Sequence, residues 1–430
     1  MAHAVSAVWP GSSGYGFPRA LRRPCGYEAY IPDRLGELQL TLPTEVVADA
    51  SDAERAIQEL NEGSPPLASL ESLARLLLRA EAVASSRIEG LTVATRRLAE
   101  AQAARDIGMP LYDVTAEAVL GNIEAMALAV NDLAMRPQVA LEDILAVHRA
   151  LMAHTSQSEP GGKVRQVKNW IGGNGYNPCN ADFVPPPPDQ VPELLADLVT
   201  FINDDCYSPL VQAALVHAQF ETIHPFADGN GRTGRAVIHV VLRRRGLAPR
   251  YVPPISLVLA TRSRDYLAGL RGTRYLGPAN SAEAQAGYAK WIEVFASAAT
   301  RASRDAAQFG RQIDDLERRW REAVGSVRAN STADLLLRSL PSAPVITVNT
   351  AARLVGRSVQ ATNLAVEQLE KAGVLVRINK VRWGRAFEAS GLLDALTRFE
   401  RSLASPTGDT RTAPPIRRVP GRAKGRSEEH

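Results

Sequence analysis

Residues 224–235 bring an unusual set of reactive side chains into one short segment, which reads HPFADGNGRTGR. His224 is a base that is neutral near pH 7 and can accept a proton from a hydroxyl group. Asp228 offers the hard oxygen ligand that Mg²⁺ prefers. Arg232 and Arg235 supply bidentate donors that suit phosphate oxygens. A base, a metal ligand and a phosphate clamp are together what phosphoryl-type transfer needs.

The elements around this segment are predicted to hold it at the junction of two helices. The apolar stretch 209–223 is expected to be helical, and Pro225 ends it, so His224 should lie at its end beside a turn. Gly229 and Gly231 let the backbone turn tightly, and the next helix is predicted to begin at or just before the second glycine. The amides at the N-terminus of that helix form an anion-binding site.

Three other interpretations of the segment are less consistent with the sequence. Residues 229–234 fit the GxGxxG pattern of dinucleotide sites, but a helix precedes them and no acidic residue occurs between Asp228 and Asp265. His224 and Asp228 could bind a metal from one helix face, but Pro225 and the glycines prevent a regular helix there. A plain connection between helices would rarely use a histidine, an aspartate, an asparagine and two arginines.

The rest of the chain up to residue 325 is predicted to be mainly helical. The first 45 residues are rich in Gly, Pro and aromatic residues and look irregular, and Ser51 is predicted to cap the first helix. Residues 159–190 are predicted to form an ordered loop or short hairpin that ends in polyproline, after which Asp189 caps a helix. Helical periodicity is expected at 67–106, 113–135, 141–154, 230–245, 263–271 and 281–325.

Residues 326–400 show a different pattern, which predicts a winged helix-turn-helix. Three short helices are expected at 332–340, 348–355 and 358–373, followed by a pair of strands. The basic tail is predicted to be disordered. The resulting domains are an N-terminal extension, a catalytic domain, a winged-helix-like domain and the tail, with bounds at 1–110, 111–325, 326–400 and 401–430.

Composition limits the classes of protein to which the chain could belong. The 430 residues carry 50 basic and 46 acidic side chains, a net charge of only +4, and a hydrophobic fraction of 45% that is ample for real cores. Cys25, Cys179 and Cys206 are widely spaced, so neither a disulfide framework nor a zinc site is expected, and a reducing compartment fits. No leader sequence and no apolar run of about 18 residues are apparent, so we expect a cytoplasmic protein that does not bind a membrane.

At residues 224–235 the sequence resembles the Fic family, whose motif reads HxFx(D/E)GNGRxxR. The upstream NWIGG at 169–173 and FVPPPP at 183–188 also resemble the family, and residues 25–130 resemble the extension of its bacterial members. The resemblance implies an all-α fold, namely a Fic-type helical bundle with a short β-hairpin flap, beside the small C-terminal winged helix-turn-helix. The positions that fill the motif are His224, Phe226, Asp228, Gly229, Asn230, Gly231, Arg232 and Arg235.

The resemblance also implies a role for each position. His224 would be the catalytic base, and Asp228 the Mg²⁺ ligand. Asn230, with the amides of Gly229 and Gly231, would cradle the α-phosphate of ATP. Arg232 and Arg235 would contact the outer phosphates, and Phe226 is expected to anchor the loop in the core. The 172–184 loop resembles the flap that holds the target segment by backbone pairing.

A second motif of the family, (S/T)xxxE(G/N), occurs in the sequence from Ser85 to Gly90. In the resemblance it belongs to an inhibitory helix, and we expect Glu89 to pair with Arg235 and so occupy the clamp for the γ-phosphate. The alternative is an ordinary exposed glutamate on a helix.

The sequence therefore predicts a Mg²⁺-dependent protein adenylyltransferase that moves AMP from ATP to a Ser, Thr or Tyr hydroxyl and is restrained by Glu89. Two alternatives stay open: removal of AMP from a modified protein at the same site, and a DNA-binding regulator that uses the Fic body as a nucleotide sensor. The expected partner is a target protein, with self-modification and a homodimer also open and nucleic acid a minor alternative.

The other histidines of the chain are less informative. His217 is interpreted as a core or supporting histidine and His239 as packed, whereas His148 and His154 show no informative spacing.

Overall fold

The computed structural model describes residues 1–11, 23–63, 70–106, 108–155, 161–174, 176–378 and 385–403, which are mainly helical. The predicted tail and the start of the second strand of the predicted pair, residues 379–384, lie outside this part of the chain. The helices are α1 Thr44–Glu62, α2 Leu70–Ile88, α3 Thr95–Asp106, α4 Val114–Asn131, α5 Leu141–Met152, α6 Val191–Asn203, α7 Pro209–Ile223, α8 Asn230–Arg244, α9 Ile255–Thr261, α10 Ser263–Gly272, α11 Ala282–Val324, α12 Thr332–Ser339, α13 Val348–Val355, α14 Val359–Lys371 and α15 Leu392–Leu403.

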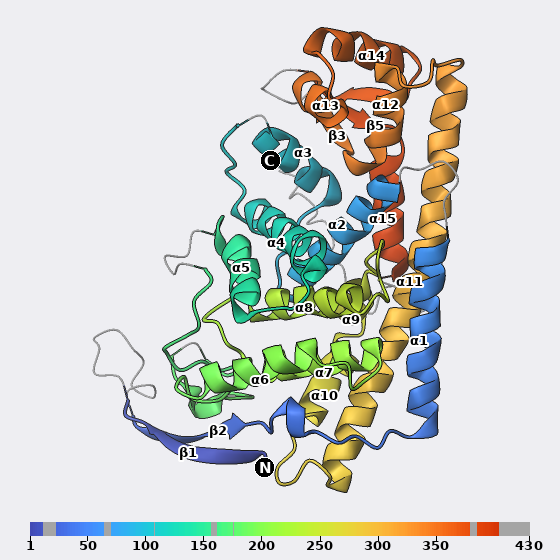
Figure 1. Cartoon of the computed structure of the whole chain (residues 1–430). Helices are drawn as coiled ribbons and strands as arrows, with labels where there is room; N and C mark the ends of the chain where they lie inside the picture. The colour runs from blue at the N-terminus through green and yellow to red at the C-terminus, as the bar shows by residue number, and fades with distance from the viewer. Residues whose placement is uncertain are drawn as a thin grey trace, which may run out of the picture.

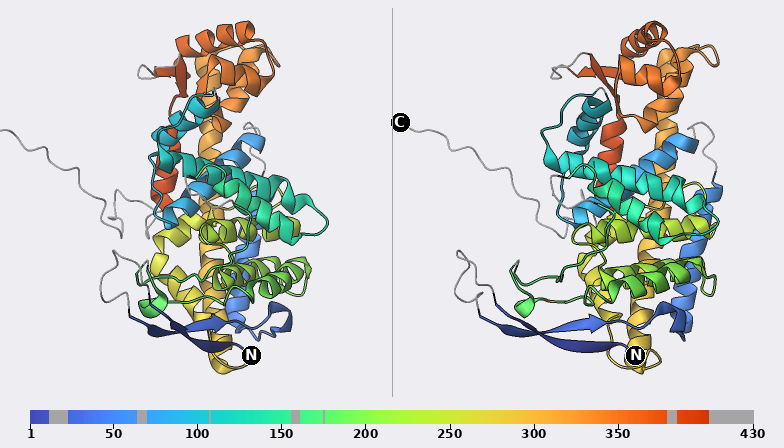
Figure 2. Two further views of the ribbon diagram at one scale, coloured as in Figure 1. Left: turned by 90° about the vertical axis from the view of Figure 1, so that its left-hand side faces the viewer. Right: turned by 60° about the vertical axis from the view of Figure 1, so that its left-hand side comes forward.

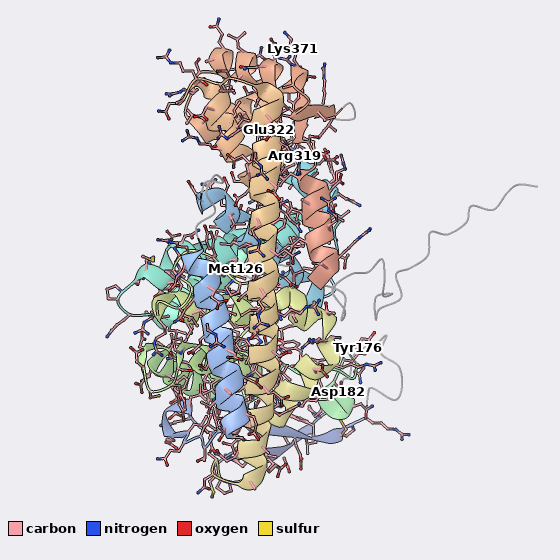
Figure 3. All side chains as sticks on the ribbon, turned by 90° about the vertical axis from the view of Figure 1, so that its right-hand side faces the viewer. Met126, Tyr176, Asp182, Arg319, Glu322 and Lys371 are labelled. Atoms are coloured by element: carbon pink, nitrogen blue, oxygen red, sulfur yellow. A yellow bond between two sulfur atoms is a disulfide. The ribbon has the colours of Figure 1, made fainter. Side chains whose placement is uncertain are left out.

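Helix α11 runs along one side of the molecule and connects its two ends (Figure 1). Its 43 residues give it a length of about 65 Å. Helix α1 packs alongside it, and Figure 3 shows the two helices next to each other. In the same view Lys371 of α14 lies at one end of the molecule, and Tyr176 and Asp182 lie toward the other. The C-terminal unit and the 172–184 loop are therefore far apart.

Helix α7 is the centre of the fold because it is buried on all sides. Every side chain from Leu210 to Ile223 is buried, and most of them are apolar, as is expected of a helix in the interior of a protein. Helix α8 packs against α7, and the indole Nε1 of Trp291 in α11 donates a 2.7 Å hydrogen bond to the carbonyl of Ala214. The turn between α7 and α8 is thus held by the most buried pair of helices.

Helix α2 is fixed to α8 and α9 by a buried polar network. The Glu81 carboxylate is fully buried, and its oxygens contact His239 Nε2 at 2.9 Å and accept hydrogen bonds from the backbone N–H and the hydroxyl of Ser256. His239 is packed, as predicted, but it has this polar partner. Because buried polar groups without partners are costly, the network sets the position of α2 beside α8.

The N-terminal region is more regular than the sequence indicates. Strands β1 His3–Trp9 and β2 Cys25–Ile31 pair antiparallel, with His3 opposite Ile31 and Trp9 opposite Cys25. This hairpin lies at the opposite end of the molecule from the C-terminal unit in all three views of Figures 1 and 2. The expectation of an irregular segment is wrong here, since the strands are stabilised by pairing across a long connection and not by a local pattern.

Several helix boundaries also differ from the prediction. The first helix begins at Thr44 after Pro43, so Ser51 lies inside α1 and caps nothing. The region 67–106 is two helices, because the chain turns after α2 at Gly90, where φ is +83°. Gln190, and not Asp189, precedes α6. The short helix α9, which follows two prolines, was not predicted.

The C-terminal residues form helices α12, α13 and α14 and an antiparallel sheet. The sheet has the order β3-β5-β4, with β3 Val345–Thr347, β4 Leu375–Ile378 and β5 Ala386–Ala389. Strand β3 and helix α15 were not predicted, although the spacing of Leu392, Leu396 and Phe399 is helical. The identification of this unit as a winged helix stays a prediction, as do the bounds of the four domains, and contact with nucleic acid stays a minor alternative.

One stretch, from Val114 to Met135, is long and apolar enough to cross a membrane by length and composition alone. Its side chains are largely enclosed by neighbouring helices, with 61% of the apolar window buried inside the fold. This burial is typical of a core helix, and α4 contacts α2, α5 and α8.

Candidate active site at the turn between α7 and α8

His224 ends α7 in the left-handed backbone conformation, with φ of 50° and ψ of 61°. Its N–H donates a 2.9 Å hydrogen bond to the carbonyl of Phe220, which closes the last turn of the helix. A positive φ is uncommon outside glycine and persists only where the surroundings enforce it. The turn therefore places the imidazole by a backbone conformation that the fold has to hold.

Arg165 provides much of that restraint. Its guanidinium donates to the carbonyl oxygens of His224 at 2.7 Å, Pro186 at 2.7 Å and Val167 at 3.1 Å, and its backbone N–H donates to Pro225 at 2.9 Å. Burial lowers the pKa of Arg165 to about 10. The sequence analysis missed this residue, since its role depends on carbonyls from three separate segments.

The loop after His224 is fastened by Asn230 and Phe226. The Asn230 side chain accepts from the Phe226 N–H and donates to the Phe226 carbonyl, both at 2.8 Å. The Phe226 side chain is fully buried, which agrees with its predicted role as an anchor. The Asn230 side chain therefore holds the loop, and its predicted part in the α-phosphate cradle, together with the amides of Gly229 and Gly231, stays a prediction.

His148 of α5 contacts the same loop, and the sequence analysis missed this supporting role as well. The Gly162 N–H donates to His148 Nδ1 at 2.8 Å, so Nε2 carries the proton and donates to the Asp228 carbonyl at 3.0 Å. The ring stacks on Phe226 with a centroid distance of 3.7 Å. Burial lowers the pKa of His148 to about 4, which keeps this neutral tautomer in place at pH 7.

The N-terminus of α8 has the features of an anion site. Gly229 adopts a positive φ of 78°, and the first hydrogen bond within the helix runs from the Thr233 N–H to the Gly229 carbonyl at 3.0 Å. The amides before Thr233 have no acceptor inside the helix. Arg232 is 4% exposed, and its Nε and Nη1 atoms are buried without a hydrogen-bond partner in the described part of the chain. Such unsatisfied donors favour an anionic ligand.

In this structure the anion at that site is the carboxylate of Glu89, which follows the last residue of α2. Arg235 Nη2 donates to Glu89 Oε1 at 2.7 Å, as expected from the sequence. The same guanidinium donates from Nε to the Ser85 hydroxyl and from Nη2 to the Ser85 carbonyl, both at 2.9 Å. A Cβ atom added at Gly231 would overlap Glu89 Oε1, so the carboxylate lies directly against the helix N-terminus.

The charges stabilise the ionised form of this contact. Burial by itself would raise the pKa of Glu89, but the Arg235 guanidinium, together with Arg232, outweighs it and lowers the pKa. The pKa of Arg235, which is 1% exposed, is raised by the two nearby carboxyl groups, Glu89 and Glu221, despite burial. The pair is therefore a charge-assisted hydrogen bond and not a weak surface contact.

His224 is neutral in this environment. Burial, and next the positive charges of Arg165 and Arg274, lower its pKa to about 4, while the Glu221 carbonyl and Glu89 act in the opposite direction. A neutral imidazole at pH 7 can accept a proton, which is what a general base requires. Behind it, burial raises the pKa of Glu221 to about 7. His217 Nε2 lies 2.9 Å from the Tyr266 hydroxyl and is fully buried, consistent with a supporting histidine.

Asp228 is the residue at this site that fits a divalent cation. Its side chain is 46% exposed at the mouth of the turn, and Oδ2 lies 3.5 Å from Arg232 Nη2. No cluster of three or more His, Cys, Asp or Glu side chains that could bind a metal occurs in the described ranges. One carboxylate is sufficient where substrate phosphates supply the other oxygen ligands, as is usual for Mg²⁺.

The 172–184 loop approaches the turn but is not a regular hairpin in its described residues. Its two arms meet at one bridge, in which Ile171 and Phe183 exchange backbone hydrogen bonds of 2.8 and 3.2 Å. Gly175 at the tip lies outside the described residues. Arg274 covers the Phe183 ring at 3.6 Å, and Asn169 donates to the Phe226 carbonyl at 3.1 Å. These contacts join the loop to the floor of the site.

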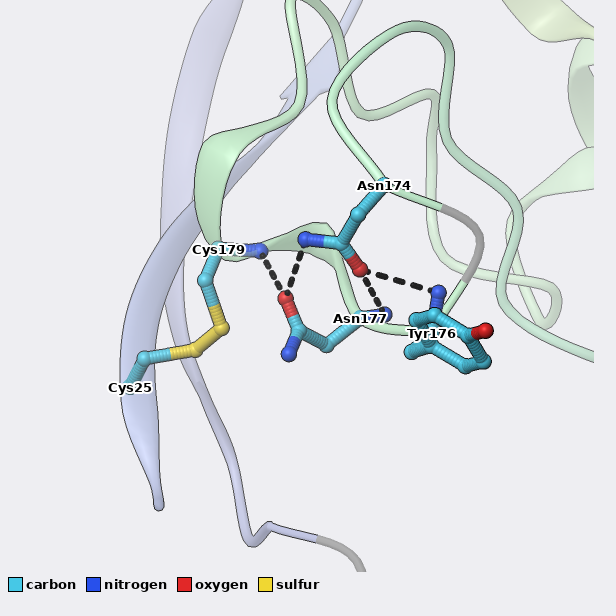
Figure 4. The surroundings of a disulfide bond; sticks show 5 residues. All are labelled: Cys25, Asn174, Tyr176, Asn177 and Cys179. Carbon is cyan, nitrogen blue, oxygen red and sulfur yellow. Dashed lines mark hydrogen bonds between the residues drawn. A yellow bond between two sulfur atoms is a disulfide. The ribbon is translucent and has the colours of Figure 1, made fainter. Parts of the chain in front are cut away.

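A disulfide links this loop to the N-terminal hairpin, contrary to the expectation from the cysteine spacing. Cys25 of β2 and Cys179 are bonded across a Cα–Cα distance of 5.9 Å and a separation of 154 residues (Figure 4). Spacing could not reveal a pairing between distant segments. Cys206 is free and exposed. Disulfides are typical of oxidising compartments, so the bond gives no support to the expected reducing, cytoplasmic location, which stays a prediction.

Comparison with known proteins finds matches to the Fic/DOC family over part of the chain. Residues 138–242 match the model of the Fic/DOC family, and residues 47–131 match that of its N-terminal region. The chain is 33% identical over 132 residues to "Protein adenylyltransferase fic-1" of Caenorhabditis briggsae, covering 30% of this chain and 23% of that protein. It is 30% identical over 213 residues to "Protein adenylyltransferase Fic" of Drosophila persimilis, covering 46% and 39%. The chain thus spans well under half the length of these relatives.

Solved structures of Fic proteins are also similar. A Fic family protein from Desulfovibrio desulfuricans is 22% identical, with a TM-score of 0.49 and coverage of 82% of this chain and 97% of that one. Fic-1 from Caenorhabditis elegans is 22% identical, with a TM-score of 0.45 and coverage of 62% and 73%. Both family models match in succession and the motif at the turn between α7 and α8 is complete, so residues 47–242 contain a Fic/DOC domain preceded by the N-terminal region of that family.

Proposed function

We propose that this chain is a protein adenylyltransferase that transfers AMP from ATP to a Ser, Thr or Tyr hydroxyl of a target protein and is restrained by Glu89. The observation that carries the proposal is the composition of the turn between α7 and α8. It combines a neutral histidine, a helix N-terminus and a buried arginine whose Nε and Nη1 atoms have no partner in the described residues. The names of the relatives agree with this activity.

The residues present account for each part of the reaction. His224 accepts the proton of the target hydroxyl, whose oxygen forms a bond to the α-phosphorus of ATP. The bond from that phosphorus to the β-phosphate bridging oxygen breaks, and pyrophosphate leaves with the electron pair. The amides at the start of α8 stabilise the charge on the α-phosphate oxygens, and Arg232 and Arg235 bind the outer phosphates. Mg²⁺, held by Asp228 and the phosphates, would neutralise charge on the pyrophosphate.

Glu89 accounts for the restraint. Its carboxylate occupies both the Arg235 guanidinium and the surface of Gly231, where an outer phosphate would have to bind. ATP would therefore have to displace a carboxylate that is already paired with Arg235. Alternatively, ATP would bind with its α-phosphate out of line with the attacking hydroxyl. The Glu89 side chain is 38% exposed, so solvent reaches it, and relief of the restraint would require that this carboxylate move away from Arg235.

The test is incorporation of AMP by the Glu89→Gly variant. We expect mass spectrometry of this variant, incubated with ATP and Mg²⁺, to show an added AMP on the chain or on an added lysate protein, at least tenfold above wild type. The double variant Glu89→Gly/His224→Ala should show none. Glu283→Gly, at an exposed glutamate in the first turn of α11, serves as a matched control and should behave as wild type.

Two outcomes would count against the proposal. Equally low incorporation in wild type and Glu89→Gly would exclude the inhibitory role of Glu89. Release of AMP from a modified protein that wild type performs and Glu89→Gly loses would favour the reverse reaction, in which Glu89 would act on a water molecule. The first assay, run with ATP and then with AMP-modified product, separates these cases.

A further inference from the structure

A second cavity lies on the other side of α2, away from the candidate active site. It has a volume of about 510 Å³ and is enclosed by α2, α3, α4, the end of α8 and the segment around β3 of the C-terminal unit. Cavities of about 300–1,000 Å³ are typical of small-molecule sites. Figure 1 shows α2 and α3 next to the C-terminal unit, with α4 below them. None of the motif residues at the turn between α7 and α8 lines it.

The cavity has an excess of positive charge. Four arginines and two acidic residues line it, which gives a formal charge of +2. Two of these six charged residues neutralise each other, because Arg75 forms an ion pair with Glu71. Of the other three arginines, Arg250 is exposed, whereas Arg79 Nη2 and Arg243 Nε are buried without a hydrogen-bond partner in the described part of the chain.

The pKa values of these two guanidinium groups shift in the direction expected of partly buried cations that lack a close anionic partner. Burial lowers the pKa of Arg79 to about 10, against the opposing effect of Glu400 and Asp106, and it also lowers the pKa of Arg243. Neither forms an ion pair within 4 Å among the described residues, unlike Arg244 and Arg245, which both pair with Asp205. Unpaired buried cations are costly, and an anion that accepts from both would remove the cost.

The remaining walls are apolar. Leu78 of α2, Ile123 and Ala127 of α4, and Leu354 of α13 contribute aliphatic surface beside the two arginines. An inorganic ion would make no contact with this aliphatic surface. A neutral ring, on the other hand, would offer no hydrogen-bond acceptor to the two guanidinium groups. We propose that the cavity binds a small organic phosphate, in which a flat apolar body lies against α4 and the phosphate accepts hydrogen bonds from Arg79 and Arg243.

Binding of 1-naphthyl phosphate, followed by isothermal titration calorimetry on the full chain, tests this proposal. We expect saturable binding to wild type, and binding at least tenfold weaker for 1-naphthol and for inorganic phosphate. Arg79→Gln and Arg243→Gln should each weaken the affinity at least tenfold. Arg264→Gln, at an exposed arginine of α10, is the matched charge control and should change it less than twofold.

Two further variants keep the result interpretable. Ala127→Leu fills the cavity without changing its charge and should also abolish binding, even if an arginine variant is unstable. Arg232→Ala removes the clamp of the candidate active site and should leave this binding unchanged. The proposal is overturned if wild type shows no saturable binding, if Ala127→Leu binds as wild type does, or if only Arg232→Ala loses it.

Discussion

At the scale of single residues, the candidate active site depends on how His224 is held. A left-handed backbone at a non-glycine residue costs free energy, on the order of 1–3 kcal/mol, which the surroundings must supply. Arg165 supplies it by binding carbonyls on both sides of the turn, and it also places a positive charge beside the imidazole. The same contacts therefore fix the direction of His224 and its protonation state.

The first prediction concerns pH. Because burial and the neighbouring arginines lower the pKa of His224 to about 4, its neutral, proton-accepting form persists as pH falls to about 5. In the Glu89→Gly background we expect kcat/KM for ATP to change less than twofold between pH 7.5 and 5.5. A histidine with the usual pKa of about 6.5 would lose roughly tenfold over that range. An acid limb centred near 6.5 would contradict the environment described for His224.

The second prediction concerns Arg165 as a positioning residue. Arg165→Lys keeps the charge but cannot reach three carbonyl oxygens at once, so several buried acceptors lose their donor. We expect the free energy of unfolding to fall by about 2 kcal/mol, and kcat in the Glu89→Gly background to fall at least tenfold, with KM for ATP changed less than twofold. Urea unfolding and steady-state kinetics measure both, with Arg264→Lys as the exposed control. A rise in KM alone would instead indicate a direct contact with ATP.

The residues of the motif could be predicted from the sequence, whereas the residues that support the motif could not. His224, Asp228 and the arginines are adjacent in the chain, so their types and spacing indicate a phosphate site. Arg165 and His148 act through backbone carbonyls of distant segments, and no pattern marks a carbonyl acceptor. Asn230 belongs to the motif, yet its side chain binds Phe226, a distinction that only the geometry can make.

At the scale of elements, the N-terminal hairpin and the 172–184 loop form one assembly. The Tyr30 N–H donates to the Val184 carbonyl at 2.9 Å, and the Trp9 and Trp170 rings meet edge to face at 5.9 Å. The disulfide from Cys25 adds a covalent link. The loop that would receive the target segment is therefore supported by strands that precede the rest of the fold in the chain.

The third prediction is that this disulfide stabilises the assembly. Its closure of a loop of about 155 residues restricts the unfolded chain, so Cys25→Ser should lower the free energy of unfolding by about 2–4 kcal/mol. Urea unfolding of wild type with and without a reducing agent should reproduce the difference. Cys206→Ser, at the exposed free cysteine, is the control and should stay within about 0.5 kcal/mol of wild type. Titration of three free thiols in the native, unreduced protein would contradict the bond.

Predictions of whole elements succeeded where periodicity is long and local. Helices α7, α8, α11 and α13 begin and end within about one residue of their predicted bounds. The hairpin β1–β2 and strand β3 were missed because each is stabilised by a partner far away in the sequence. Helix α1 was started too late, since the capping pattern at Ser51 is a weaker signal than the proline that precedes Thr44.

At the scale of the whole molecule, α2 connects the C-terminal unit to the candidate active site. Its final residues lead to Glu89, and Arg87 Nη2 in the same turn donates to Glu400 of α15 at 3.1 Å. Helix α15 is itself fixed on α11, where the Phe309 and Phe399 rings stack at 4.3 Å. The position of the Glu89 carboxylate is thus set partly by a unit that lies outside the matched family regions.

The fourth prediction follows from that connection and rests on the proposed activity. Glu400→Ala removes the partner of Arg87 and loosens the end of α2, so we expect basal incorporation of AMP to rise about threefold to tenfold, corresponding to a coupling of roughly 1 kcal/mol. Arg87→Ala should have the same effect, and the double variant should add little to either single one. Glu388→Ala is the matched control, because Glu388 is equally buried in the C-terminal unit but pairs with Arg96 of α3. If Glu388→Ala raised incorporation as much as Glu400→Ala, the effect would reflect general loosening of the C-terminal unit and not a specific restraint on α2.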